Sequence, residues 1–318
     1  MLYFVEKDSI VRRIWGKSDT ILFIFAGAAA EFALNKAVDW LYFTGRLPAD
    51  PLARLFSTVG YARRIVFSSI DQAHAAIDMM RQIHDAVEQK RGARIPDWAY
   101  RDVLFMLIHY SIAAYELLER KLSAAEKEEV YHVFYRVGDR MGVQDLPPNY
   151  TAWLPVRAAH LAEDLQQSAY TLDLFQQYKK HLGALRFKVL IEGQKLVVPD
   201  RVKTLLHFSD FSLLTPVVPL YKVSCWLKMD WLLKALLLPA DYKKEIAALD
   251  VGVIFNESPA EDSEGMVMDG FGLLWSQLME AMKDIALLAT VLIFFSQGIQ
   301  LSLILDSLYY ILLNLKQG

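Results

Sequence analysis

The sequence predicts an all-α fold, with a large multi-helix domain followed by an apolar helical tail. Apolar residues recur at intervals of three and four positions through about the first 250 residues, which places them on one face of successive helices. Gly, Pro, Ser and Asp clusters interrupt this pattern at intervals that suit ordinary helix lengths. No repeat with a fixed period is visible, so a solenoid is not expected.

The N-terminal part contains four stretches with clear amphipathic spacing. Each is bounded by residues that start or stop helices, such as Pro51, Asp71, Gly92 and Pro96. The spacing therefore predicts helices over residues 12–36, 51–67, 70–90 and 97–120.

The middle of the chain continues in the same way. Ser123 and Glu126 have the spacing of a capping box, which starts a helix that runs to about Met141 and stops at Gly142. Residues 150–180 predict one or two further helices, and residues 213–238 are apolar nearly all round, as in a buried or membrane-touching segment. One exception is residues 187–198, which resemble a short β-hairpin with its turn at Gly193.

The composition suits a protein with a large core and argues against one class of partner. Of 318 residues, 54% are hydrophobic, and the mean hydropathy is +0.21. Thirty-four basic and 37 acidic residues give a net charge of −3 with no Lys/Arg-rich block, so no nucleic-acid partner is expected. Cys225 is the single cysteine, which excludes an internal disulfide and fits a reducing compartment.

The C-terminal part differs from the rest. We expect a helical domain over residues 1–255, an acidic linker over 256–270 and an apolar tail over 271–318. Residues 285–305 are uncharged and about long enough to cross a bilayer, although Gln297 and Gln300 make a poor spanning helix.

Such an apolar tail must meet another surface. We expect it to contact a membrane by spanning it or lying in its interface, to pack on the protein itself, or to join a homo-oligomer. The N-terminus has early charges and no continuous apolar core, so no cleavable signal peptide is expected. A cytoplasmic or membrane-associated location follows.

Four polar residues lie within apolar helical sequence and are candidate site residues. Arg54 and Thr58 stand four positions apart and share a helix face, and His84 lies among apolar residues on the next predicted helix. From the residues alone, His84 is either a hydrogen-bonded core histidine or a ligand. His109, beside Tyr110, is either part of a polar network between helices or a pocket residue.

The pattern resembles the rubber oxygenase (latex-clearing protein) and MpaB-type oxygenase family. Arg-x-x-x-Thr at positions 54–58, Ile-His at 83–84 and Ile-His-Tyr-Ser at 108–111 follow one another in the family's order. Arg-Ile-Trp-Gly at 13–16, the segment 121–143 and Leu-Leu-Leu-Pro at 236–239 extend the resemblance over about residues 10–248.

The resemblance implies an all-helical enzyme that holds haem b through a histidine and acts with dioxygen on a hydrophobic substrate, isoprenoid or lipid. His84 matches the position of the iron ligand, Arg54 and Thr58 would line the pocket as catalytic residues, and His109 is a further cofactor-binding candidate. A guanidinium suits a propionate or an oxygen species, and a hydroxyl can donate to bound dioxygen.

Two positions depart from the family. Ser57 stands where rubber-cleaving members have a lysine as second axial ligand, and Asn35-Lys36 stands where many bacterial relatives have His-Pro. The second departure and the apolar tail favour an alternative, a non-catalytic, membrane-associated helical protein that binds a lipid or a partner.

No other catalytic motif is apparent. Gly-x-Ser-x-Gly, phosphate-loop, His-Glu-x-x-His and Cys-x-x-Cys patterns are all missing. The acid pair Glu163-Asp164 reads as a solvated helix face. Surface or structural roles are expected for the remaining histidines, which are His74, His132, His160, His181 and His207.

Overall fold

A computed structural model describes residues 2–43 and 51–226, and these residues confirm the all-α prediction. They form helices and no strand, apart from two isolated bridges, Tyr3 with Ser69 and Asn35 with Leu165. The helices are α1 (Ile10–Trp15), α2 (Ser18–Phe32), α3 (Val38–Phe43), α5 (Pro51–Phe67), α6 (Ile70–Arg91), α7 (Asp97–Leu118), α8 (Ala124–Met141), α9 (Tyr150–Glu163), α10 (Ala169–Val197), α11 (Asp200–Leu206) and α12 (Val217–Trp226).

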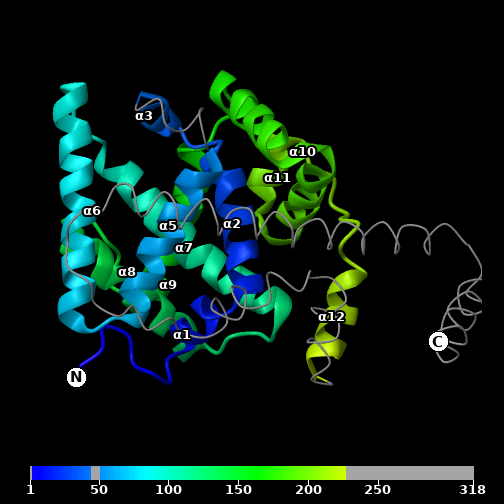
Figure 1. The fold of residues 1–318 in the computed structure, drawn as a ribbon, viewed down its shortest axis with the longest axis horizontal. Helices are drawn as coiled ribbons and strands as arrows, with labels where there is room; N and C mark the ends of the chain where they lie inside the picture. Colours follow the sequence, from blue (N-terminus) through cyan, green and yellow to red (C-terminus); the bar gives the residue numbers. More distant parts are fainter. Residues whose placement is uncertain (1, 44–50, 227–318) are drawn as a thin grey trace, which may run out of the picture.

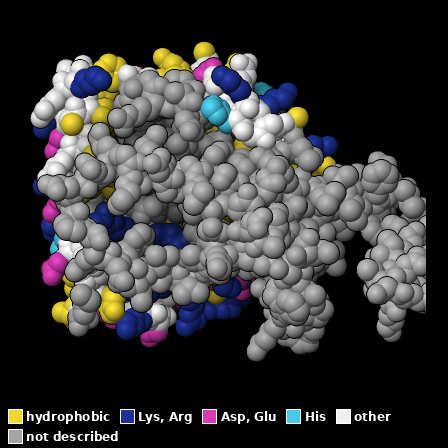
Figure 2. All heavy atoms as spheres, viewed as in Figure 1, with side chains coloured by type: hydrophobic (Ala, Val, Ile, Leu, Met, Phe, Trp, Pro, Cys, Tyr) yellow, Lys and Arg dark blue, Asp and Glu magenta, His cyan; other side chains and the backbone are white. Residues whose placement is uncertain are grey.

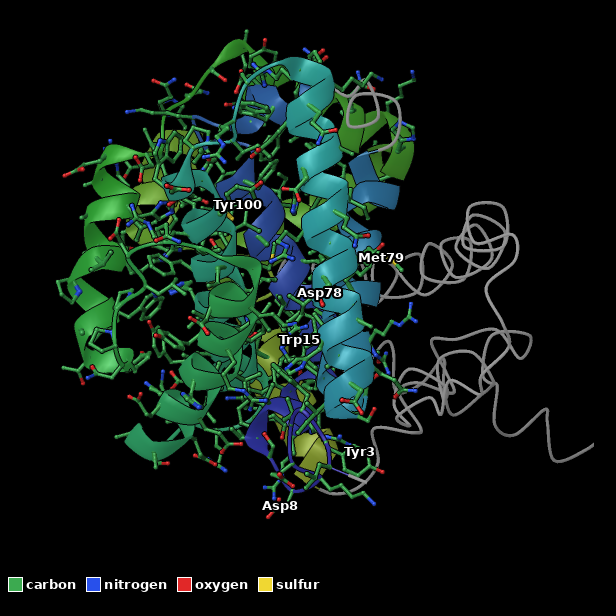
Figure 3. All side chains as sticks on the ribbon, turned by 90° about the vertical axis from the view of Figure 1, so that its left-hand side faces the viewer. Tyr3, Asp8, Trp15, Asp78, Met79 and Tyr100 are labelled. Carbon is green, nitrogen blue, oxygen red and sulfur yellow. The ribbon has the colours of Figure 1, made fainter. Side chains whose placement is uncertain are left out.

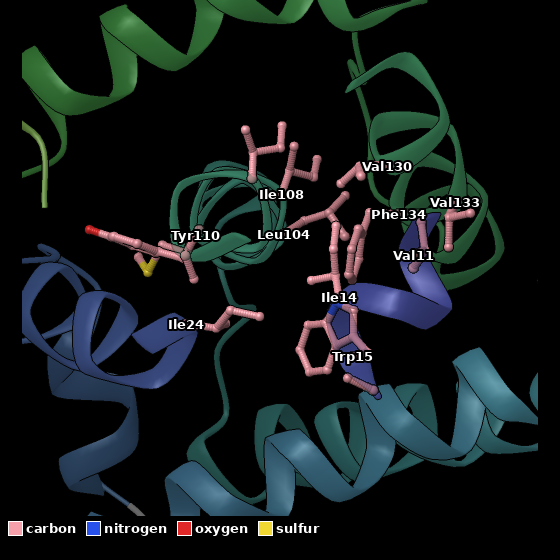
Figure 4. Packing of buried hydrophobic residues seen from close by; sticks show 14 of the residues in the cluster. Val11, Ile14, Trp15, Ile24, Leu104, Ile108, Tyr110, Val130, Val133 and Phe134 are labelled. Carbon is pink, nitrogen blue, oxygen red and sulfur yellow. The ribbon is translucent and has the colours of Figure 1, made fainter. Parts of the chain in front are cut away.

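Helix α7 is the centre of the structure. It packs against α1, α2, α8, α10 and α12, while α6 stands at one edge and α10 and α11 lie toward the opposite side (Figure 1). Its sequence has apolar residues on nearly every face, as expected of a helix with neighbours all round. The close-up in Figure 4 shows this core, with Val11, Ile14 and Trp15 of α1, Leu104 and Ile108 of α7, and Val130, Val133 and Phe134 of α8.

Local chemistry sets the ends of the helices that position the candidate site. Ser69 and Gln72 form a capping box at the start of α6, and Ser123 and Glu126 form the predicted one at the start of α8. Gly92 and Gly142 end these helices with φ of 69° and 81°, a backbone conformation that glycine adopts without a steric penalty. The predicted stop at Gly142 is therefore confirmed.

The long helix predicted over residues 12–36 is wrong in its continuity. The chain forms two helices, α1 and α2, because Gly16 ends the first and Lys17 is extended, with φ −111° and ψ 120°. Asp19 then accepts a hydrogen bond from the Thr20 N–H at 2.8 Å in the first turn of α2. The apolar periodicity continues through Gly16 and Lys17, so by itself it does not reveal the change in backbone conformation there.

The hairpin predicted over residues 187–198 is also wrong, since α10 continues through Val197. Gly193 is helical, and a Cβ there would lie 3.7 Å from Phe23 of α2, so this position is part of a helix packing face. The real break in this region is Gly183, with φ 75° and ψ 166°, where α10 kinks. A few alternating apolar residues did not distinguish a strand from a buried helix.

Some predictions fall outside the described residues, including the linker at 256–270 and the tail at 271–318 with its segment 285–305. Among helices in the ranges 2–43 and 51–226, none is long and apolar enough to cross a membrane. On the face in Figure 2, basic and acidic side chains both lie along the coloured margin, in keeping with the nearly balanced charge.

Candidate functional site

Helices α5 and α6 carry three of the four predicted site residues. The backbone of Arg54 and Thr58 belongs to α5, where their spacing places them on one face. Thr58 is half-buried, whereas the side chains of Arg54 and Ser57 lie outside what the structure describes. The structure thus supports the predicted helix and leaves the predicted role of Arg54 and Thr58 as a hypothesis.

His84 lies in the C-terminal half of α6 and is half-buried. Its ring meets the ring of Tyr100 edge to face, with centroids 5.3 Å apart. Tyr100 in turn donates a hydrogen bond of 3.1 Å to Glu88 Oε1, and Figure 3 shows Tyr100 beside this half of α6. The His84 ring is therefore supported by an aromatic residue that is itself anchored.

The surroundings of His84 are less buried than its apolar sequence suggests. Ile77 is fully buried, but Ile83, the residue just before His84, is 40% exposed. His84 itself is half-buried, and its role as a core histidine or as a ligand stays a prediction.

Helices α5 and α6 pack together and are joined through Ser68 and Ser69, so they run in opposite directions. Arg54 precedes this connection by 14 residues and His84 follows it by 15, which corresponds to about 21–23 Å along each helix. The two residues are consequently at similar heights on the hairpin. This arrangement is compatible with a shared pocket.

His109, the fourth predicted site residue, lies on α7 and not on the α5–α6 hairpin. It lies nine residues after Tyr100, or about 13 Å further along the helix, and its ring meets that of Tyr110 at 5.0 Å. Burial lowers the pKa of His109 to about 4, the Arg157 guanidinium acts in the same direction, and Glu31 opposes them. His109 is therefore a neutral imidazole beside the pair formed by Glu31 and Arg157.

Glu31, Arg157 and Tyr110 form the inner part of a buried polar cluster between α2, α7 and α9. Arg157 donates two hydrogen bonds of 2.5 Å to the Glu31 carboxylate, and Tyr110 donates a third of 2.8 Å. Glu31 is 0% exposed. Burial alone would raise the pKa of Glu31, but Arg157 and His160 outweigh it and hold this pKa well below its usual range.

His160, Asp102, Asn35 and Asp164 form the outer part of the same cluster. His160 Nε2 lies 3.1 Å from Glu31 Oε1, while Nδ1 contacts Asp102 Oδ1 and lies 3.4 Å from Asp164 Oδ2. Asp102 Oδ2 accepts a 2.7 Å hydrogen bond from the Asn35 amide. Although burial opposes it, the carboxylates of Asp102 and Glu31 raise the pKa of His160. Burial also raises the pKa of Asp102, against the effect of His160.

Asn35 and Lys36, the departure from the family's His-Pro, belong to this cluster. Besides its bond to Asp102, Asn35 accepts a hydrogen bond from the Ala37 N–H at 2.8 Å. The Lys36 N–H donates to the Asp164 carbonyl at 2.9 Å, a bond that a proline could not make. These two residues tie α2 to the end of α9.

Sequence reasoning missed this cluster. His160 and the pair Glu163-Asp164 were expected at the surface or in structural positions, yet His160 is 4% exposed and Asp164 is half-buried. The signal present in the sequence was the i, i+4 spacing of His160 and Asp164, which places both on one helix face. The partners on α2 and α7 are too distant in sequence to be recognised.

Comparison with known proteins gives one result. A family model described as ER-bound oxygenase mpaB/B'/Rubber oxygenase, catalytic domain, matches residues 12–241. This range contains both the α5–α6 hairpin and the buried cluster. No curated protein and no solved structure matches the chain.

Proposed function

Because the chain belongs to the MpaB and rubber oxygenase family, we propose that it is a haem b-dependent oxygenase that acts with dioxygen on a hydrophobic substrate, isoprenoid-like or lipid-like. The family match over residues 12–241 is the observation that carries the proposal. Within it, His84 occupies α6 in the half-buried position described above, beside Tyr100.

The residues present suit a haem. A neutral imidazole is a good iron ligand, and the edge contact with Tyr100 supports the orientation of the His84 ring. Arg54 is a permanent cation suited to a propionate or another anion, at a similar height on the hairpin. Thr58 brings a hydroxyl donor to the same face of α5.

When bound, haem would supply the oxygen chemistry itself. The chain's own contribution is to hold the group through His84, to orient it through Arg54 and to present the Thr58 hydroxyl as a proton donor or acceptor. The surrounding apolar helices would bind the hydrophobic substrate. His109 is neutral at physiological pH and is a weaker candidate for the pocket than His84, because it lies beside the Glu31–Arg157 pair and not on the α5–α6 hairpin.

Haem retention tests the proposal directly. In purified full-length protein, His84→Ala should remove the Soret band and leave the helical circular dichroism unchanged. His74→Ala is a matched control, since His74 lies half-buried on the same helix with its ring edge to face against Phe4 at 5.9 Å. Equal haem content in both variants would remove His84 as the ligand and direct attention to His109.

Oxygen-dependent turnover tests the role of the α5 residues. Thr58→Ala should keep haem but slow turnover, and Thr58→Ser should restore it because the hydroxyl returns. Arg54→Ala should weaken both haem retention and turnover. If wild-type protein takes up no haem at all, the alternative of a non-catalytic helical protein that binds a lipid or a partner is favoured, in line with the altered Asn35-Lys36 position.

A further inference from the structure

We propose that Asp102, His160 and Asp164 bind a divalent metal ion of the Mn²⁺ or Zn²⁺ class between α7 and the end of α9, separately from any haem. Their ligand atoms, one imidazole nitrogen and two carboxylate oxygens, all lie within 4.8 Å of one another. Imidazole and carboxylate together are ligands that borderline and hard divalent cations share. This inference does not rest on the proposed function.

The state of His160 Nδ1 is the observation that points to a ligand. This atom contacts Asp102 Oδ1 and lies 3.4 Å from Asp164 Oδ2, so one buried nitrogen faces two carboxylates. The side chain of His160 is 3% exposed, so bulk water does not reach this nitrogen. Such a nitrogen and the two carboxylates place three ligand atoms around one point, where a divalent cation would take the place of the His160 proton.

The spacing of the ligands fits an ion. Metal to ligand distances of about 2.0–2.2 Å place two ligands on one tetrahedral ion about 3.4 Å apart. His160 Nδ1 and Asp164 Oδ2 are separated by 3.4 Å. Asp102 Oδ1 lies closer to Nδ1, and a small rotation of the Asp102 carboxylate would bring it to the distance that an ion requires.

The groups behind the ligands hold them in place, as is usual in metal sites. His160 Nε2 faces the Glu31 carboxylate at 3.1 Å, the pairing that fixes a metal-bound histidine in the tautomer with Nδ1 free. The Asn35 amide holds Asp102 Oδ2 at 2.7 Å and leaves Oδ1 toward His160. The Lys36 N–H donates to the backbone carbonyl of Asp164, which fixes the main chain at the third ligand.

Charge and access are also favourable. Within residues 2–43 and 51–226, the carboxylates of Glu31, Asp102 and Asp164 surround His160, and Arg157 pairs with Glu31, so a divalent ion that displaces the His160 proton would balance the two remaining carboxylates. The Asp164 side chain is 26% exposed, which gives the ion a route from solvent. The competing arrangement is a protonated His160 that bridges the carboxylates with no metal.

Manganese binding distinguishes the two arrangements. Full-length protein, freed of loosely bound metal with EDTA, is titrated with Mn²⁺ and followed by the loss of the free Mn²⁺ signal in electron paramagnetic resonance. We expect a single bound ion per chain that Zn²⁺ displaces. Asp164→Asn should weaken binding by at least about tenfold, and Glu163→Gln, which removes an exposed charge one residue away, should bind as the wild type does.

A second measurement identifies the histidine. Pulsed electron paramagnetic resonance of the bound Mn²⁺ should show coupling to a nitrogen nucleus, and His160→Gln should abolish it. No binding at millimolar Mn²⁺ or Zn²⁺, equal binding by the two acid variants, or bound Mn²⁺ without nitrogen coupling would each overturn the proposal. EDTA does not extract haem iron, so the Soret band and the Mn²⁺ titration can fail independently.

Discussion

The α5–α6 hairpin and the cluster around Glu31 differ in how deeply they bury their polar side chains. In the hairpin, Thr58 and His84 are half-buried, and the His84 ring packs edge to face against the Tyr100 ring. In the cluster, Glu31 and Arg157 are at most 4% exposed and paired through two charge-assisted hydrogen bonds. A half-buried group can meet a ligand at little cost in stability, whereas a buried charge is tolerated only with its partner in place.

This difference predicts where the fold is most sensitive. Glu31→Gln should lower the free energy of unfolding by about 3–5 kcal/mol, because the buried Arg157 loses its counter-charge. Urea denaturation followed by circular dichroism measures the loss. Asp200→Asn is the control, since its pair with Lys203 has a carboxylate that is 98% exposed and should matter little.

Equal stability of Glu31→Gln and the wild type would mean that the cluster does not hold α2 to α9. The cluster would then contribute no more to the stability of the fold than the half-buried residues of the hairpin do. A large loss in the Asp200→Asn control would indicate instead that stability in this chain follows surface charge.

The next effect concerns acid. The folded pKa of His109, about 4, lies below the ordinary value of 6.5, so the unfolded chain takes up this proton at a higher pH than the folded chain does. The neutral histidine therefore favours folding above pH 6.5, and this contribution falls as the pH drops from 6.5 toward 4. Its full size is at most about 3 kcal/mol.

His109→Gln should flatten this part of the dependence of stability on pH, measured by denaturation at a series of pH values. His181→Gln, at an exposed position, should leave the dependence unchanged. An unchanged acid slope in His109→Gln would place the His109 ring in solvent rather than beside the Glu31–Arg157 pair.

A single methyl group tests how tightly the cluster is packed. A Cβ at Gly27 of α2 would lie 2.2 Å from the Tyr110 ring, whose hydroxyl donates to Glu31. Gly27→Ala should displace that ring, weaken the hydrogen bond and destabilise the protein by about 1–3 kcal/mol, as overpacking of a core does. Thermal unfolding measures the change, and a gain in stability would show that Tyr110 moves freely.

The sequence predicted the hairpin better than the cluster for a physical reason. Helix periodicity and capping residues act over a few positions, so α5 was predicted with its observed ends and Gly142 was predicted as the stop of α8. The contacts of Asn35 with Asp102 and of Glu31 with His160 join residues 67 and 129 positions apart. No local pattern encodes such pairings.

The family resemblance predicted candidate site residues but not the contacts of the residues that depart from the family. It pointed to His84, Arg54 and Thr58 through the order of short motifs, but it gave Asn35-Lys36 only as a departure from the family's His-Pro. In the structure Asn35 orients Asp102 and Lys36 bonds to the backbone of Asp164. A substitution that breaks a family motif can thus be fully integrated in the packing of its own chain.

The smallest expected effect is at Gly60, on the hairpin. Gly60 lies inside α5, is exposed, and a Cβ there meets no described atom within 4 Å. Alanine loses less backbone freedom than glycine on entering a helix, so Gly60→Ala should raise the free energy of unfolding by up to about 1 kcal/mol. The same substitution at Gly27 should act in the opposite direction, although both glycines are helical. Measured side by side by thermal unfolding, the two variants separate helix propensity from packing, and a loss of stability at Gly60 would show that the hairpin is packed as closely as the cluster.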